Sequence, residues 1–188
     1  MGRFDERLNA PQGILLCPMP SLLSPIALEP IQRDRASVLQ NLFELYVHDF
    51  SEQVPLRLQE SGRFELSPGE VWWIRDDHFP YFIRSGGDLA GFALARQGSR
   101  VTEAVDVMDI AEFFVLRGAR RAGVGTGAAH ALFELFPRAW EVRVRRTNSA
   151  ALSFWSRAIE SWTGQPAAMT STSIEGVEWN VAKFGAAA

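Results

Sequence analysis

Hydrophobic residues recur along this chain with two different spacings, one typical of helices and one typical of strands. From about Asp34 to Glu52, apolar residues return every third or fourth position, which predicts a helix with one apolar face. His48, Asp49 and Glu52 lie toward the end of this segment, and we expect them to form a solvated last turn. A glycine-rich turn and a second helix ending near Phe136 follow later in the chain.

Short apolar or alternating segments predict the strands. Residues 26–31 could form a first strand, and residues 81–84 and 89–96 flank a Gly-Gly turn that favours a hairpin. Residues 108–116 are largely apolar, as expected for a central strand covered on both faces. Residues 139–146 alternate apolar with charged positions, which is the period of a strand.

The C-terminal part continues the same mixture of elements. Asn148 or Ser149 is suited to cap a helix that runs to about Ser161. Two further strands are predicted at about 167–173 and 177–184, joined at a Glu-Gly turn. Strands and helices in this order predict an α+β or α/β layered fold around a single sheet.

Length and composition fit one globular domain. The chain has 188 residues, of which 47% are hydrophobic and 22% charged. We assign residues 25–188 to the domain, and residues 1–24, which are proline-rich and without period, to an N-terminal extension that could be flexible. Cys17 is the only cysteine, so an intramolecular disulfide is excluded, as suits a reducing cytoplasm.

Net charge and hydropathy exclude two classes of binding partner, nucleic acids and membranes. A formal net charge of −3 provides no basic surface for nucleic acid. No apolar run approaches the ~20 residues of a membrane span, so we expect a cytoplasmic protein without a membrane partner.

Asp76, Asp77 and His78 invite comparison with a metal site. Consecutive residues point in diverging directions, however, and no further ligand cluster with recognisable spacing follows. We therefore expect no metal, and interpret the irregular, aromatic segment 61–79 as a loop that faces a substrate.

The sharpest motif is the segment from Arg120 to Gly127, which contains three glycines at alternate positions after a buried strand. Each glycine inside a helix costs roughly 1 kcal/mol relative to alanine, so three at a helix start need an explanation. Glycine lets another group approach the backbone, and the first turn of a helix offers unpaired N–H groups and a positive dipole end to phosphate. The segment therefore predicts a pyrophosphate site, with Arg120 and Arg121 adding positive charge.

Other interpretations of this loop fit less well. A dinucleotide fingerprint requires Gly-x-Gly-x-x-Gly near the start of a βαβ unit, whereas this spacing is Gly-x-Gly-x-Gly and late in the chain. An ATP-type phosphate loop requires a Gly-Lys-Ser/Thr sequence, which the segment lacks. A tight packing turn without any ligand is the structural alternative.

Two segments resemble the GCN5-related N-acetyltransferase (GNAT) family. That family carries Arg/Gln-x-x-Gly-x-Gly/Ala after its fourth strand, and Arg120, Gly123 and Gly125 match this motif. Downstream, Asn148-x-x-Ala151-x-x-Phe154-Trp155 is similar to the family's Asn-x-x-Ala-x-x-Phe/Leu-Tyr segment. The resemblance is clear from about residue 110 to 155, and the order of elements extends it loosely over residues 26–184.

The resemblance implies a fold and a set of cofactor contacts. It implies a mixed, mostly antiparallel sheet of about seven strands flanked by helices, with the fourth and fifth strands splayed apart so that acetyl-coenzyme A enters between them. It further implies main-chain contacts to the pantetheine arm from one strand, main-chain contacts to the pyrophosphate from the glycine loop, and a channel wall from the downstream segment. The implied residues are Phe113, Phe114 and Val115 on the strand, Arg120, Arg121, Ala122, Gly123, Val124, Gly125 and Thr126 in the loop, and Asn148 and Trp155 downstream.

Trp155 departs from the family pattern. Many members have a tyrosine at this position, which protonates the leaving thiolate. An indole N–H can donate a hydrogen bond but cannot act as a general acid near pH 7. Water, Tyr46 or Tyr81 could replace it, or the thiolate needs no dedicated donor, since a thiol pKa near about 8.5 makes it a tolerable leaving group.

Asp109 and Glu112 are the candidate bases for an amine acceptor. Glu112 stands where similar polyamine-type acetyltransferases carry an acidic residue, and Asp109 where histone-type members place their glutamate. Three residues apart, they face opposite sides of a regular strand, and only a bulge would bring both to one site. Either could instead be a structural carboxylate.

The sequence therefore predicts an N-acetyltransferase. The expected reaction moves acetyl from acetyl-coenzyme A to a primary amine of a small molecule or peptide by direct attack in a ternary complex, because no credible covalent nucleophile is present. The alternative is a catalytically weak acyl-coenzyme A-binding module with a regulatory role. A homodimer is compatible with either, and the sequence does not name the acceptor.

Overall fold

The computed structural model describes residues 25–185, so the predictions for the extension 1–24 and for Cys17 lie outside the described residues. Within the described range, seven strands form one sheet in the order β1-β2-β3-β4-β5-β7-β6. The strands are β1 (Ile26–Pro30), β2 (His78–Ser85), β3 (Asp88–Gln97), β4 (Val107–Val115), β5 (Ala139–Arg145), β6 (Met169–Ile174) and β7 (Val177–Phe184).

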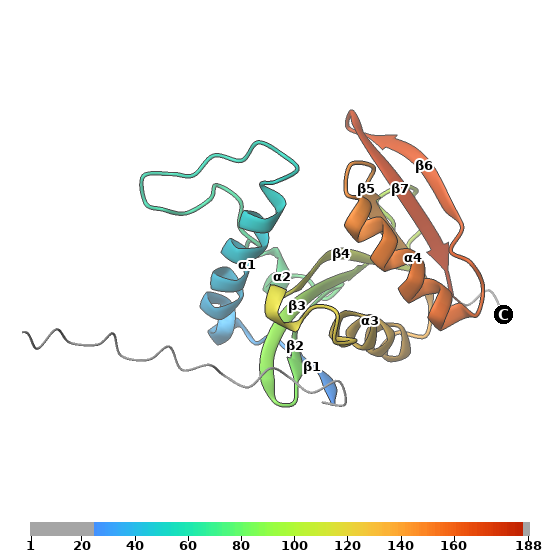
Figure 1. Ribbon diagram of the computed structural model, residues 1–188, viewed down its shortest axis with the longest axis horizontal. Coiled ribbons are helices and arrows are strands. Elements are labelled where there is room, and N and C mark those ends of the chain that lie inside the picture. The colour runs from blue at the N-terminus through green and yellow to red at the C-terminus, as the bar shows by residue number, and fades with distance from the viewer. Residues whose placement is uncertain (1–24, 186–188) are drawn as a thin grey trace, which may run out of the picture.

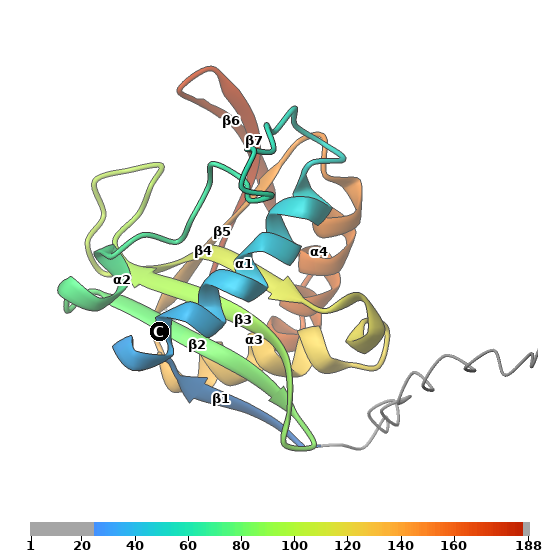
Figure 2. The same cartoon turned by 90° about the vertical axis from the view of Figure 1, so that its left-hand side faces the viewer.

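Four α-helices and two 3₁₀ turns accompany the described strands. They are η1 (Arg33–Arg35), α1 (Ala36–Phe50), α2 (Val71–Ile74), η2 (Arg117–Ala119), α3 (Val124–Leu135) and α4 (Ser149–Thr163). Figures 1 and 2 show α1 lying across one face of β2, β3 and β4, with α3 on the opposite face. The predicted class, a layered α+β fold with a mixed sheet, is confirmed.

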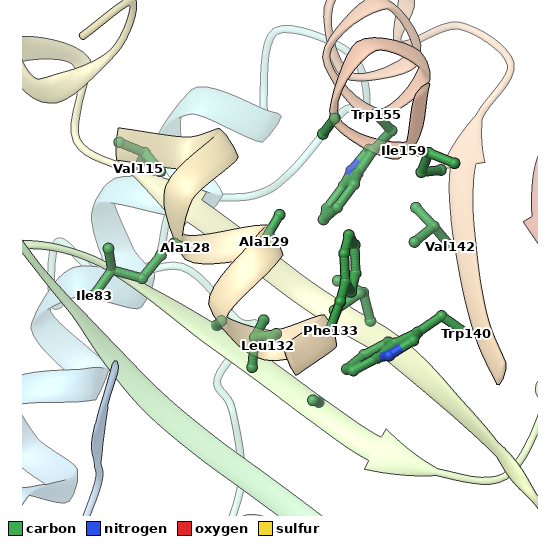
Figure 3. Packing of buried hydrophobic residues seen from close by; sticks show 14 of the residues in the cluster. Ile83, Val115, Ala128, Ala129, Leu132, Phe133, Trp140, Val142, Trp155 and Ile159 are labelled. Atoms are coloured by element: carbon green, nitrogen blue, oxygen red, sulfur yellow. The ribbon is translucent and has the colours of Figure 1, made fainter. Parts of the chain in front are cut away.

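Each face of the sheet has its own apolar core. The core on the α1 side includes Leu39, Phe43, Phe82 and Phe92, all nearly or fully buried. The core on the α3 and α4 side is larger. Figure 3 shows Phe133 of α3 and Trp155 of α4 pointing into the space between the two helices and the sheet. These two cores hold the sheet between helical layers and fix the positions of β4 and β5.

The strands β4 and β5 are paired for only part of their length. They run parallel, the one parallel pair among the described strands, and pair only from Val107 to Ile110 of β4 and from Ala139 to Val142 of β5. Beyond these residues β4 continues with β3, and β5 continues with β7. The predicted splay between the fourth and fifth strands is therefore confirmed, and it begins after Ile110.

A bulge in β4 begins at the same place. Leu94 of β3 pairs with Glu112, but the next residue, Ala95, pairs with Ile110, so Ala111 is the extra residue. Arg96, two residues beyond Leu94 and on the same face of β3, pairs with Asp109. The bulge thus places Asp109 and Glu112 on the same face of the sheet, where a regular strand would have placed them on opposite faces.

Several elements differ from the sequence prediction in extent. The segment 61–79, expected to be irregular, contains the short helix α2 and the first residues of β2. These elements were not predicted because the aromatic residues of the segment follow neither the helical nor the strand spacing. No helix in residues 25–185 is both long enough and apolar enough to cross a membrane.

Gly91 allows β3 to lie close to the end of β4. A Cβ built on Gly91 would lie 2.0 Å from the carbonyl oxygen of Phe114. We expect Gly91→Ala to lower the free energy of unfolding by about 1–3 kcal/mol, since the strands must shift to admit the methyl group. Gly118→Ala is the control, because nothing lies within 4 Å of a Cβ there. Equal denaturation midpoints for the two variants would contradict this account.

Candidate functional site

A cleft of about 810 Å³ opens where β4 and β5 part. Tyr46 of α1 lines it from one face of the sheet, and Asn148 and Trp155 line it from the α4 side. Because α1 and α4 cover opposite faces, the cleft passes between the two strands. Among the residues that line it are Ile110, Ala111, Glu112 and Phe113 of β4 and Val142, Arg143, Val144 and Arg145 of β5.

Glu112 is a β4 carboxylate that reaches this cleft. The phenol of Tyr46 donates a hydrogen bond to its Oε2 over 2.5 Å. Burial raises the pKa of Glu112 above the ordinary value of 4.5, and this effect outweighs the Tyr46 hydrogen bond, which acts in the opposite direction. Burial, and then the charge of Glu112, also raise the pKa of Tyr46, so the phenol keeps its proton. The pair is a carboxylate with increased basicity beside a fixed donor.

Asp109 lies on the same face but is fully buried and does not line the cleft. Arg96 donates from Nε and Nη2 to its Oδ2, over 2.9 and 2.7 Å. Arg143 donates to both carboxylate oxygens, over 3.1 and 3.0 Å. Four N–H groups therefore surround Asp109, which ties β3 and β5 to β4. This geometry is that of a structural carboxylate, and it favours Glu112 as the base.

Glu141, the β5 neighbour of Asp109, is equally buried. Its carboxylate accepts hydrogen bonds from the Ser99 hydroxyl over 2.6 Å and from the backbone N–H of Arg100 over 3.1 Å. Lys183 Nζ lies 3.4 Å from the same carboxylate. Glu141 therefore fixes the loop after β3, which contributes one wall of the cleft.

The glycine-rich segment forms the turn into α3, as predicted. Arg121 and Gly123 have positive φ angles of 62° and 79°, and Gly123 is the N-cap of the helix. Arg121 is one of two non-glycine residues with positive φ among the described residues, a conformation that costs energy outside glycine. Left-handed residues in such a turn direct successive N–H groups toward one point. The start of α3 has no side-chain cap hydrogen bond, so it adds the N–H groups of Val124, Gly125 and Thr126. The arrangement suits an anion.

The three glycines of this segment have different structural roles. A Cβ on Gly125 would lie 3.0 Å from the ring of Phe154, and one on Gly127 would lie 3.0 Å from Ile26 Cγ1. These two glycines therefore allow α3 to pack against α4 and β1. Gly123 has open space around it and needs its positive φ. Only Gly123 fits the predicted role of a residue that leaves room for a ligand at the backbone.

Arg120, whose side chain is 42% exposed, donates to groups of the protein itself. Its Nε donates to the carbonyl of Val115 over 2.8 Å, and its Nη2 donates to Asp49 over 2.5 Å. Arg117 also pairs with Asp49, and with Glu52. The expectation of a solvated last turn is met by His48 and Glu52, whose side chains are 73% and 70% exposed, and is wrong for Asp49, which is 19% exposed and holds the end of α1 against this turn.

Of the remaining predicted cofactor residues, Phe113, Asn148 and Trp155 line the cleft, whereas Phe114 and Val115 do not. Asn148 caps α4, since its Oδ1 accepts from the N–H of Ala151 over 2.9 Å, and the predicted cap is confirmed. Trp155 is 5% exposed and packs edge-on against Phe113, with ring centroids 5.1 Å apart. Phe113, Phe114 and Val115 belong to the part of β4 that has no partner strand on its β5 side. Trp155 thus forms an apolar wall of the cleft.

The two tyrosines considered as replacements for an acid differ in position. Tyr46 lines the cleft and Tyr81 does not. Tyr81 lies on β2 and packs near Phe136, with ring centroids 6.4 Å apart. Only Tyr46 is therefore positioned for a role in the site.

The Asp-Asp-His segment forms an ion-pair cluster at one end of the cleft. Arg75 donates to Asp77 over 2.8 and 2.5 Å, and His78 Nδ1 lies 2.7 Å from the same carboxylate. Across residues 25–185, no group of three or more His, Cys, Asp or Glu side chains is arranged to hold a metal ion. Arg75, Asp77 and His78 line the cleft, and Asp76 does not.

Sequence reasoning did not identify the arginines of β5 as site residues. Arg143 and Arg145 occupy charged positions of the alternating segment 139–146, and such positions usually indicate a face of the strand that is exposed to solvent. Here β5 lies inside the sheet, between β4 and β7, so this face points toward the cleft. Three charged residues on one face of a central strand were the signal available in the sequence.

Known proteins share this fold. The family model described as the acetyltransferase (GNAT) family matches residues 39–159. An acetyltransferase from Thermus thermophilus is similar with a TM-score of 0.64 at 12% identity, over 88% of this chain and 99% of that one. No curated protein matches the chain in sequence.

Two further solved structures hold ligands. Aminoglycoside acetyltransferase AAC(6')-Ib, in complex with coenzyme A and kanamycin, has a TM-score of 0.64 at 12% identity, over 86% of this chain and 95% of that one. Arabidopsis thaliana NAA60, in complex with acetyl-CoA, has a TM-score of 0.54 at 14% identity, over 86% and 98%. At these identities the similarity shows the fold.

The contrasting environments of Asp109 and Glu112 predict opposite effects on stability. Asp109→Asn leaves two largely buried guanidinium groups without their counter-charge, so we expect the free energy of unfolding to fall by about 3–5 kcal/mol. The measurement is chemical denaturation near pH 7. A loss below about 1 kcal/mol would show that Asp109 is not the structural centre of this face.

Glu112→Gln is the matched comparison. Because folding raises the pKa of Glu112, the stability linked to this group is fully present below its unfolded pKa and is lost as pH rises through its folded pKa. The glutamine variant lacks this loss, so its stability relative to the parent should improve as pH rises from about 4 toward 8.

Proposed function

Because the chain belongs to the GNAT acetyltransferase family, we propose that it moves an acetyl group from acetyl-coenzyme A to a primary amine. The observation that carries the proposal is the cleft between β4 and β5. Glu112 lines this cleft on the part of β4 that has no partner strand on its β5 side. Coenzyme A and acetyl-CoA in the related structures support the choice of donor. The acceptor is a small molecule or peptide amine.

The described residues fit this donor in two places, the turn into α3 and the unpaired edge of β4. The N–H groups from Arg121 to Thr126 are oriented for the pyrophosphate, with the helix dipole adding positive potential. The unpaired edge of β4 from Phe113 to Val115 provides main-chain groups for the pantetheine arm. Acetyl-coenzyme A, when bound, supplies the acyl group and the thiolate leaving group.

Glu112 removes a proton from the amine in this proposal. An ammonium group must lose a proton before its nitrogen can attack a carbonyl carbon. The raised pKa of Glu112 makes it a better proton acceptor than an ordinary carboxylate. Tyr46 holds the carboxylate in place by its hydrogen bond, and its own raised pKa keeps it a donor. Direct attack in a ternary complex is favoured because the cleft lining described here contains no cysteine.

Many relatives have a tyrosine at the position of Trp155, and its phenol protonates the leaving thiolate. With Trp155 at this position, that phenol is missing. The Tyr46 proton is already donated to Glu112. A thiol pKa near about 8.5 lets the thiolate depart without a dedicated acid. The alternative function, a weak acyl-coenzyme A-binding module, would retain cofactor binding and lack turnover.

Acetyl-coenzyme A is expected to raise the melting temperature, because a ligand that binds only the folded state stabilises it. Gly123→Ala should reduce that shift, since a side chain at φ 79° distorts the turn whose N–H groups face the anion. Gly118→Ala, in open space on the preceding turn, is the control and should keep the full shift. The absence of a shift in the parent at millimolar acetyl-coenzyme A would refute the proposed donor.

Glu112→Gln is expected to lower turnover by about 100- to 10,000-fold while acetyl-coenzyme A affinity hardly changes, because general-base catalysis contributes about that much. In the parent, kcat/KM should rise with pH along an acid limb centred above 4.5, since the base works only when deprotonated. The variant should lose that limb. Coenzyme A release at the parent rate would remove Glu112 from the mechanism, and release by neither protein would favour the binding module.

A further inference from the structure

Arg145 is a cleft residue whose charge is unmatched. Its Nε is buried and has no hydrogen-bond partner within residues 25–185, and the guanidinium forms no ion pair with a described carboxylate. The guanidinium lies over two rings, with its carbon 5.3 Å from the Phe50 centroid and 5.5 Å from the Trp179 centroid. These aromatic contacts restrict the guanidinium without using its N–H groups.

An unpaired guanidinium in such a place requires an explanation. Leaving a buried donor unsatisfied costs about 1–3 kcal/mol, and more for a charged group. Exposed arginines satisfy their N–H groups with water at no such cost. Arg145 is therefore in a suitable state to bind an anion that enters the cleft.

The charges around the cleft also favour an anionic ligand. Five arginines line it, Arg75, Arg96, Arg100, Arg143 and Arg145, against two carboxylates, Asp77 and Glu112. Arg75 is matched by Asp77, and Arg96 by Asp109. Arg143 pairs with Asp109 and lies 3.9 Å from Glu141. Even with the buried Asp109 and Glu141 included, the five arginines exceed the four carboxylates.

This positive charge is separate from the predicted pyrophosphate site. None of the residues from Arg120 to Thr126 lines the cleft. The three arginines that belong to strands lie on the α1 face of the sheet with Glu112 and Tyr46; they are Arg96, Arg143 and Arg145. The anion that they fit therefore belongs to the acceptor and not to the phosphates of the donor.

Resting on the function proposed above, we infer that the acceptor is a small amine that also carries an anionic group, a carboxylate or a phosphate. Its ammonium group is directed to Glu112, and its anionic group accepts hydrogen bonds from Arg145. Carboxylates and phosphates both match the planar fork of a guanidinium. A polycationic amine would be repelled by the same arginines.

Matched acceptor pairs test this inference in the parent protein. Coenzyme A release is measured with amino acids and with their amides, and with O-phosphoethanolamine and ethanolamine. Spermidine and kanamycin represent polycations. We expect kcat/KM to be at least about tenfold higher for the anionic member of one pair, and which pair responds distinguishes carboxylate from phosphate. Faster transfer to the amides, to ethanolamine or to the polycations would overturn the inference and leave the acetyltransferase function intact.

Arg145→Gln tests the residue itself. We expect KM for the preferred anionic amine to rise about 10- to 100-fold, with little change for its neutral counterpart or for acetyl-coenzyme A. Arg146→Gln is the control, because Arg146 is the next residue, is 63% exposed and lies outside the cleft lining. Equal effects of Arg145→Gln on both members of the pair, or a rise in KM for acetyl-coenzyme A instead, would contradict the assignment.

A binding measurement separates this inference from the proposed function. The preferred anionic amines should raise the melting temperature of the parent and of Arg146→Gln without any acetyl-coenzyme A, but not that of Arg145→Gln. If acetyl-coenzyme A fails to bind, the proposed function is refuted. The melting-temperature shift caused by the anionic amines still tests the anion site at Arg145. No shift with any amino acid or with O-phosphoethanolamine would overturn the inference.

Discussion

The site depends on the separation of β4 from β5 after Ile110 and Val142. Up to these residues the two strands share main-chain hydrogen bonds, and beyond them each continues with a different neighbour. The bulge at Ala111 begins where the pairing ends, and it turns Glu112 to the α1 face. Without the separation there would be no passage through the sheet, and without the bulge the carboxylate would face the other core.

Buried ion pairs hold the separated strands in position. Asp109, at the last paired level but one, binds Arg96 of β3 and Arg143 of β5, while Glu141 binds the loop after β3. Two separating strands cannot be fixed by main-chain hydrogen bonds, so side chains have to connect them. Such pairs are costly to bury and more costly to break, which makes the geometry of the cleft specific rather than merely stable.

Glu112 and Arg145 show how a site departs from the rules that stabilise a fold. A carboxylate with a raised pKa and a guanidinium without a partner both reduce the stability of the empty protein. Both charges would be offset by an acceptor that carries an ammonium and an anion. Perturbed ionisable groups gather at functional sites for this reason.

The sequence by itself determined the order of the elements, the glycine turn into α3, the cap at Asn148 and the family, because these rest on local periods and on residues close together in the chain. Only the tertiary structure decided between Asp109 and Glu112, since their roles depend on a bulge defined by pairing with β3 and on arginines from other strands. Arg145 likewise became a candidate only when Phe50 and Trp179, distant in sequence, were found in contact with its guanidinium. Periodicity assigns a residue to a face, but the fold decides whether that face meets water, a core or a substrate.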